Sequence, residues 1–330
     1  MDVVEPSTPS RRRLVAMIRI VVGVAVAVVL GGRLLAASHD DALPELTGMT
    51  IVWLVGALVF TAAGLVLSAV RWQRVLRLLE READLGRLLN HYAAGQFVGN
   101  LLPTTVGGDV LRIARLGRDN DDTPTSFASV VLERLTGWLV LPAFILAGMA
   151  VNPGLARLGT ASTVAIVIAV LTVGVLLLLL WAAEHPRFGG RLLGRSRWRQ
   201  LLGAVHFGVV SLRRHPREVV SVLTTAAAYQ AVLIVAAFMA ARAVGIDLGP
   251  TAFVAFIPAV LIAQVLPLSI SGLGLREGAL VLFLHPLGVS DAQSIVLGLL
   301  LYALNLVVSL AGAPSFAFGA RSIRERTVVP

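Results

Sequence analysis

The sequence predicts an all-α polytopic membrane protein with about six spanning helices and two re-entrant helical hairpins related as an inverted repeat. The 330 residues are 57% hydrophobic and 14% charged, with a mean hydropathy of +0.84, outside the range of soluble domains. Several apolar runs reach the roughly 20 residues that a helix needs to cross the hydrocarbon core. A Pro- and Gly-rich motif also occurs twice, at an offset of 164 residues, close to half the chain.

The first copy of the motif runs from Asn100 to Arg112 and the second from Gln264 to Arg276. Both copies read as a side-chain amide, two aliphatics, Pro, any residue, a hydroxyl, a β-branched aliphatic, a small residue, Gly, two variable positions, Leu and Arg. The matched polar positions indicate an internal duplication. The residues expected to shape the two breaks are Pro103, Gly107, Gly108, Pro267, Gly272 and Gly274.

Six apolar runs are expected to cross the membrane, within one membrane domain over 14–320. The N-terminal tail 1–13 ends in three Arg, and the run after it, 14–37, is longer than a signal-peptide core. An uncleaved first helix is therefore preferred over a cleaved signal peptide. The other spans are expected over 50–70, 126–151, 158–183, 218–243 and 292–320, before a C-terminal tail at 321–330.

Three segments interrupt this pattern. Residues 86–118 and 251–287 hold the two motif copies and are too polar and too broken by Pro and Gly to be clean spans. Each is expected to form a re-entrant hairpin, because broken backbone at membrane depth is tolerated where protein or water satisfies it. Residues 191–215 carry apolar side chains at helical spacing opposite a basic face, which predicts an amphipathic helix in the interface.

The distribution of Arg supports this map. With six crossings, most of the Arg lie on one side, in the termini and in 71–87, 112–124 and 184–217. The positive-inside rule makes that side the cytoplasm. We therefore expect a multi-pass protein of the plasma (inner) membrane with both termini cytoplasmic. The two hairpins then enter from opposite sides, an arrangement that transporters use to place a site near the midplane.

Composition excludes several classes of function. The chain has no Cys, which excludes disulfides, thiolate metal sites and Cys nucleophiles. It also has no Lys, which excludes a Schiff-base Lys and argues against a P-loop ATPase. The six His show no metal-ligand spacing, so no metal, cofactor or catalytic residue is expected. The net charge of +9 follows from topology, and no nucleic-acid partner is expected.

The motif residues predict a site for a phosphate-bearing headgroup. A broken helix presents unpaired N–H groups and the positive end of its dipole, here where new helices are expected to start near Asp109 and Leu273. Arg112 and Arg276 are expected one turn inside those starts, where a guanidinium suits bidentate phosphate contact. The alternative, that the charges only pair with each other and hold the hairpins, stays open. The expected substrate-binding residues are Arg112, Arg276, Asp109, Glu277, Thr105, Ser269, Ser271, Asn100 and Gln264.

Other polar residues lie inside the expected spans. Glu133 and Arg134 are about two turns into the third span and are expected to pair with neighbours or with motif charges, as candidates for charge coupling. Glu277 is expected to point away from Arg276, because adjacent residues face different sides of a helix. Four further polar residues are expected to form interhelical hydrogen bonds: Tyr229, Gln230, Tyr302 and Asn305.

The two motifs together resemble the flippase-like membrane domain of lysylphosphatidylglycerol synthases. The resemblance rests on 102–103, 107–109 and Arg112, paired with Pro267, 271–274 and 276–277, and it covers about residues 14–320. It implies a fold with re-entrant helices, movement of polar-headgroup lipids between leaflets, and motif roles for Asp109, Arg112, Arg276 and Glu277. In the two-domain synthases a soluble aminoacyl transferase follows the membrane domain. This chain lacks it, so lipid aminoacylation is not expected.

The preferred hypothesis is a lipid translocase, not an enzyme. Its partners would be membrane lipids, either anionic phospholipids or polyprenyl-phosphate-linked lipids, with a separate glycosyltransferase or lipid-modifying enzyme as a further candidate partner. The rival is an intramembrane phosphatase or transferase acting on a polyprenyl phosphate, with Ser269 or Ser271 as nucleophile beside Arg276 and Glu277. A third candidate is an accessory subunit that scaffolds a glycosyltransferase.

Overall fold

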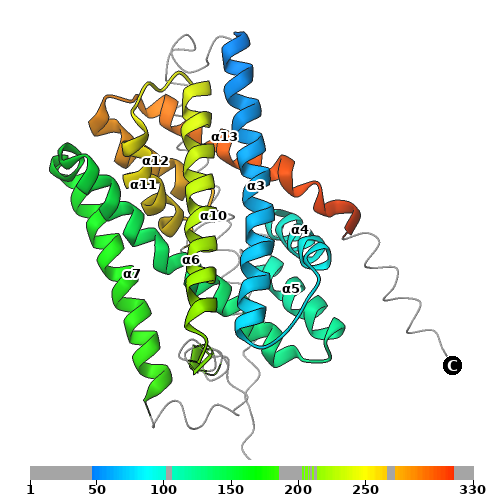
Figure 1. Ribbon diagram of the computed structural model, residues 1–330. Helices are drawn as coiled ribbons and strands as arrows, with labels where there is room; N and C mark the ends of the chain where they lie inside the picture. The colour runs from blue at the N-terminus through cyan, green and yellow to red at the C-terminus, as the bar shows by residue number, and fades with distance from the viewer. Residues whose placement is uncertain are drawn as a thin grey trace, which may run out of the picture.

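The computed structural model describes residues 47–101, 106–185, 214–265 and 272–315, together with isolated positions between 203 and 211. Every element in these ranges is helical, and five helices are long and apolar enough to cross a membrane (Figure 1). They are α3 (Gly48–Leu78), α6 (Thr123–Val151), α7 (Thr160–Glu184), α10 (Pro216–Ala243) and α13 (Asp291–Ser309).

These five helices confirm the expected second to sixth spans as apolar helices. The last one is shorter than predicted, because α13 ends at Ser309, before a turn and a few further helical residues up to Ser315. The first span 14–37, the tails 1–13 and 321–330, and most of the interfacial helix 191–215 lie outside the described residues.

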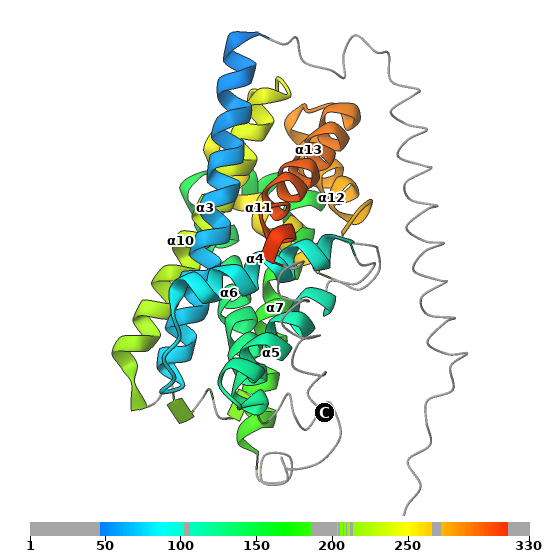
Figure 2. The same ribbon diagram turned by 90° about the vertical axis from the view of Figure 1, so that its right-hand side faces the viewer.

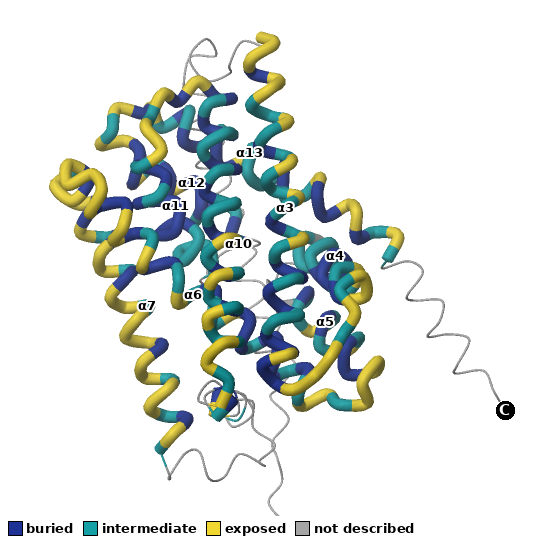
Figure 3. Tube along the Cα trace, viewed as in Figure 1, coloured by how far each residue is buried: buried dark blue, intermediate teal, exposed yellow. Residues whose placement is uncertain are grey.

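Helix α7 shows most clearly what faces the lipid. Its 25 residues, at about 1.5 Å each, extend roughly 37 Å, longer than a hydrocarbon core of about 30 Å. Apolar side chains such as Leu171, Leu177 and Leu178 are exposed along it, and Figure 3 shows α7 exposed along most of its outer side. No water-soluble fold leaves such a surface open, whereas a bilayer covers it.

Small residues let the long helices approach closely. Helices α3 and α10 run antiparallel side by side (Figures 1 and 2), and a Cβ added at Gly56 of α3 would lie 2.7 Å from Sδ of Met239 on α10. A Cβ at Gly148 of α6 would lie 2.5 Å from the backbone N of Ala255. Close backbone approach through small residues is typical of helix packing in membranes.

Within the described ranges, four shorter α-helices accompany them: α4 (Leu85–Leu101), α5 (Val106–Asp119), α11 (Pro250–Ala263) and α12 (Leu275–Leu284). Each motif copy therefore lies where one helix ends and a short helix begins, as predicted. Helix α5 begins three residues before the expected start at Asp109, and α12 two residues after Leu273. In the view of Figure 1, α4 and α5 lie in the lower half and α12 in the upper half.

Two apolar cores hold these short helices in place. In the upper half, Phe253 and Phe256 of α11 pack with Phe283 of α12, and the Phe256 and Phe283 rings stack at 5.3 Å between centroids. In the lower half, Trp72 and Leu76 of α3 pack with Leu116 of α5 and with α4. The two motif regions thus sit in separate cores of one helical body.

Candidate functional site

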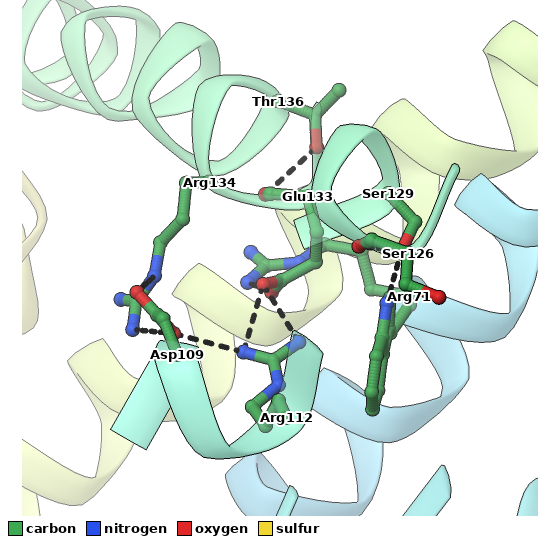
Figure 4. A network of polar contacts seen from close by, with 9 residues as sticks. Arg71, Asp109, Arg112, Ser126, Ser129, Glu133, Arg134 and Thr136 are labelled. Carbon is green, nitrogen blue, oxygen red and sulfur yellow. Dashed lines mark hydrogen bonds and ion pairs between the residues drawn. The ribbon is translucent and has the colours of Figure 1, made fainter. Parts of the chain in front are cut away.

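A buried carboxylate joins three helices in the lower half of the molecule. Glu133 of α6 is 0% exposed and accepts hydrogen bonds from Arg71 of α3 and Arg112 of α5 (Figure 4). Nη1 and Nη2 of Arg112 lie 3.3 and 3.2 Å from its Oε2. Because the three residues are far apart in the sequence, this contact fixes how α3, α5 and α6 pack.

Arg112 is held against two aromatic rings. Its Cζ lies 4.3 Å from the ring centroid of Trp72 and 4.0 Å from that of Tyr92. Trp72 is itself fixed, since its Nε1 donates to Oγ of Ser129 at 2.9 Å. Two cation–π contacts and a carboxylate offset the desolvation of the buried cation and leave it little freedom to turn.

The accessible part of the network is a second ion pair. Nε and Nη2 of Arg134 donate to the two carboxylate oxygens of Asp109, at 3.1 and 2.9 Å. Oδ1 of Asp109 also lies 3.4 Å from Nη1 of Arg112, which joins both pairs into one network (Figure 4). Three guanidiniums face two carboxylates, so 3 − 2 leaves a net charge of +1.

Two buried N–H donors of Arg71 have no acceptor among the described residues. Its Cζ lies 4.6 Å from the ring centroid of Tyr229 on α10, and among the described residues nothing accepts from its Nε or Nη1. A Cβ at Gly137 would lie 2.9 Å from that Nη1, so Gly137 makes room for the guanidinium. Nε2 of the neighbouring Gln230 donates to the Gly137 carbonyl at 3.5 Å.

The second motif forms a smaller, local ion pair. Nε and Nη2 of Arg276 donate to Oε1 of Glu277 at 3.1 and 2.7 Å, which corrects the expectation that Glu277 points away. The reason is local: Glu277 reaches back over the first turn of α12 and its other oxygen accepts from the N–H of Gly274. Arg276 also lies over the ring of Tyr302 on α13, 5.4 Å from its centroid.

Helix α13 contacts both motif regions through polar side chains. Tyr302 contacts Arg276, and one turn further Asn305 accepts a hydrogen bond from Gln96 of α4. Gln96 in turn lies one turn after Tyr92, the residue stacked on Arg112. The order Arg276, Tyr302, Asn305, Gln96, Tyr92, Arg112 is called the polar row below.

The sequence prediction named most members of this network but not all. Glu133 and Arg134 do pair with motif charges, as one of the two expected alternatives had it. Arg71 and Trp72 were not predicted, because the second span was ended at residue 70. Tyr92 lies within the expected first hairpin 86–118 but was not singled out there. The signal that extends α3 to Leu78 is the apolar spacing of Trp72, Val75 and Leu76, all of them buried.

The remaining motif residues are two amides, four glycines and five residues outside the described ranges. Nδ2 of Asn100 is buried with no acceptor among the described residues. Gln264 packs against Gly272, since a Cβ added at Gly272 would lie 3.1 Å from the Cβ of Gln264. Gly272 and Gly274 have φ of 77° and 84°, the left-handed region that favours Gly, while Gly107 and Gly108 are helical. The expected residues that lie outside the described ranges are Pro103, Thr105, Pro267, Ser269 and Ser271.

Within the described ranges, no group of three or more His, Asp or Glu is placed to hold a metal ion. The carboxylates of the network are instead engaged by guanidiniums, which suits the recognition of anions by the remaining N–H groups.

Comparison with known proteins agrees with the fold. Residues 18–312 match the family model described as the lysylphosphatidylglycerol synthase TM region, and a search of curated proteins gave no match. Together with the five apolar helices, the match makes the chain a multi-pass membrane protein. Since the matched range spans most of the 330 residues, the protein belongs to the family of the lysylphosphatidylglycerol synthase TM region.

Proposed function

We propose that the protein is a lipid translocase, which moves a lipid with a phosphate-bearing headgroup between the leaflets of the plasma membrane. The observation that carries the proposal is the polar row, because it links two buried Arg clusters across an otherwise apolar helical body. Buried charges inside a membrane domain are costly and mark pathways for polar groups. The headgroup would follow the row while the acyl or prenyl tails stay in hydrocarbon.

The two motif regions would act as re-entrant hairpins of an inverted repeat. Helices α4 and α5, with 17 and 14 residues, extend only roughly 25 and 21 Å, and α12 has 10 residues; none of these crosses a hydrocarbon core of about 30 Å alone. Helix α3 runs towards the first hairpin and α6 leaves it in the opposite direction, while α10 and α13 do the same at the other end (Figures 1 and 2). With the expected span at 14–37, this makes six crossings.

The Arg distribution supports an orientation. The lower end of Figure 1 carries the end of α3 and the start of α10, with Arg74, Arg77, Arg81 and Arg217 near it. The upper end has few Arg, such as Arg157 and Arg242. By the positive-inside rule we assign the lower end, and with it both termini, to the cytoplasm.

Charge supports an anionic headgroup. The first cluster has a net charge of +1, which a phosphodiester monoanion would neutralise. We propose that Arg112 and Arg276 present the headgroup contacts at the two ends of the row, and that Glu133, Asp109 or Glu277 couples movement to protons. Because the sequence has no nucleotide-binding motif, transport would be downhill or ion-driven.

The test is a leaflet-exchange assay in proteoliposomes with labelled phosphatidylglycerol and a labelled polyprenyl phosphate. We expect Arg112→Ala and Arg276→Ala each to abolish exchange in folded protein, and Asn305→Leu, which interrupts the row without removing a charge, to slow it about tenfold. Exchange retained in both Arg variants would refute the site. Release of inorganic phosphate from the polyprenyl phosphate would favour the rival intramembrane phosphatase instead.

A further inference from the structure

The pair of Asp109 and Arg134 differs from the rest of the network in its accessibility. The side chain of Arg134 is 45% exposed and that of Asp109 20%, whereas Glu133 and Arg112 beneath them are closed off. The guanidinium and the carboxylate meet with both oxygens engaged. An incoming anion would therefore meet Arg134 first and would find Asp109 already on it.

The position of Arg134 along α6 bears on what its side chain faces. Arg134 lies eleven residues after Thr123, where α6 begins. This is roughly 16 Å along the helix axis, about half the thickness of a hydrocarbon layer of about 30 Å. A charged side chain exposed to lipid tails at that depth is costly. An opening that admits water or a headgroup at this face removes that cost.

We propose that Asp109 is a built-in competitor of the headgroup: its carboxylate occupies, on Arg134, the place that a lipid phosphodiester takes during transport. This inference rests on the proposed function and deepens it. A carboxylate and a phosphodiester each offer two oxygens to the guanidinium fork, so one replaces the other without loss of hydrogen bonds. The displaced Asp109 keeps a partner, because its Oδ1 already lies 3.4 Å from Nη1 of Arg112.

The exchange also defines the class of headgroup. With Asp109 retained, the network charge of +1 falls to 0 when a monoanion binds, and a neutral lipid gains nothing from displacing the carboxylate. The ligand is thus a lipid with a single negative phosphodiester. Competition by Asp109 keeps its binding weak enough for release, as transport requires.

The experiment measures binding of fluorescently labelled phosphatidylglycerol to the full chain in detergent. Asp109→Asn removes the competitor and is expected to raise affinity about tenfold, equivalent to about 1.4 kcal/mol, and to slow leaflet exchange by retarding release. Arg134→Gln is expected to lower affinity about tenfold. Labelled diacylglycerol should be unaffected in all variants, and free glycerol phosphate and inorganic phosphate serve as competitors that separate the lipid from its soluble headgroup.

The chain offers a matched control in Arg81 and Asp122. Their side chains are 51% and 22% exposed, and they form an ion pair at 2.7 Å at the end of α6, away from the network. Asp122→Asn frees Arg81 as Asp109→Asn frees Arg134, and Asn still caps α6. We expect no change in affinity. An equal rise in both variants would overturn the inference, because any freed Arg would then suffice.

Three further outcomes of the binding and exchange assays test the competition by Asp109. Unchanged or weaker binding in folded Asp109→Asn contradicts the competition, even if the wild type exchanges lipid. Tighter binding in that variant, with no exchange by the wild type, supports the competition and refutes the translocase. If Asp109→Asn does not fold, Arg134→Gln is compared with Arg81→Gln, and equal affinities for phosphatidylglycerol overturn the proposal.

Discussion

The two motif copies carry an Arg at the same position, 164 residues apart, yet the two Arg are held in different ways. Arg112 is fixed by residues from three other helices, namely Glu133, Trp72 and Tyr92. Arg276 is fixed mainly by Glu277, its neighbour in the chain. The first cluster has a surplus charge of +1, and the second is neutral. A duplicated motif thus does not produce a duplicated site.

The difference follows from where each helix begins. Arg112 is the seventh residue of α5 (Val106–Asp119) and projects from its middle towards α3 and α6. Arg276 is the second residue of α12 (Leu275–Leu284), in the first turn with Glu277. In the first copy the acidic residue of the first turn, Asp109, instead reaches across to Arg134. The first cluster is therefore a junction between helices, and the second is mainly a helix cap.

The largest expected difference between the clusters comes from their carboxylates. Glu133→Gln leaves the buried Arg71 and Arg112 without a counter-charge and is expected to lower the free energy of unfolding by roughly 3–5 kcal/mol. Glu277→Gln leaves only Arg276 without its counter-charge, and the amide oxygen of the Gln can still accept from the N–H of Gly274. The free energy of unfolding is therefore expected to fall by only about 1–3 kcal/mol. Unfolding in mixed SDS micelles measures both.

The opposite order of stability in these two variants would break the comparison. Glu133→Asp tests whether the charge or the position of the carboxylate matters more, because it keeps the carboxylate on a shorter side chain. We expect its unfolding free energy to lie between those of the wild type and Glu133→Gln. If it matched Glu133→Gln, the position of the carboxylate rather than its charge would hold the junction.

This contrast also explains how much could be predicted from the sequence. The apolar runs located five described spans, with starts within about three residues of the observed ones, because long hydrophobic helices are set by local composition. The breaks at the two motifs followed from Pro and Gly. The ion pair of Glu133 with Arg71 could not be predicted in the same way, since it joins positions 62 residues apart through the packing of α3 against α6.

The local pair in the second motif was missed for a different reason. Adjacent residues of a regular helix point apart, but Arg276 and Glu277 lie in the first turn, where Glu277 turns back to the N–H of Gly274. The capping position, not the helical spacing, was the usable signal.

The second prediction concerns the contact between α4 and α5. A Cβ added at Gly108 of α5 would overlap the backbone O of Gly95 on α4, and neither backbone can move aside without separating the two helices. Gly108→Ala is therefore expected to lower the unfolding free energy by about 1–3 kcal/mol and to separate α5 from α4. In α12, a Cβ added at Gly278 would have no heavy atom of the described residues within 4 Å.

The matched variant Gly278→Ala is thus expected to be neutral or more stable, by up to about 1 kcal/mol from helix propensity. Both variants are compared in the same unfolding assay. A destabilising Gly278→Ala would show that α12 is as tightly enclosed as α5 and would weaken the distinction between a junction and a cap.

The smallest expected effect lies outside the membrane-spanning segments and tests the control used for binding. The N–H of Thr125, donated at 3.0 Å, lowers the pKa of Asp122 below its ordinary value, and Arg81 acts in the same direction. A carboxyl group with a lowered pKa stabilises the fold above its unfolded pKa of about 3.9, and this contribution is lost as the pH falls through its folded pKa. The melting temperature should fall less below about pH 4 in Asp122→Asn than in the wild type, and the two should match at pH 7 because Asn also caps.

Equal acid sensitivity would mean that the acid response comes from other carboxylates. A lower melting temperature of the variant at pH 7 would show that the ion pair with Arg81 matters at the surface, and would reduce the contrast between exposed and buried pairs.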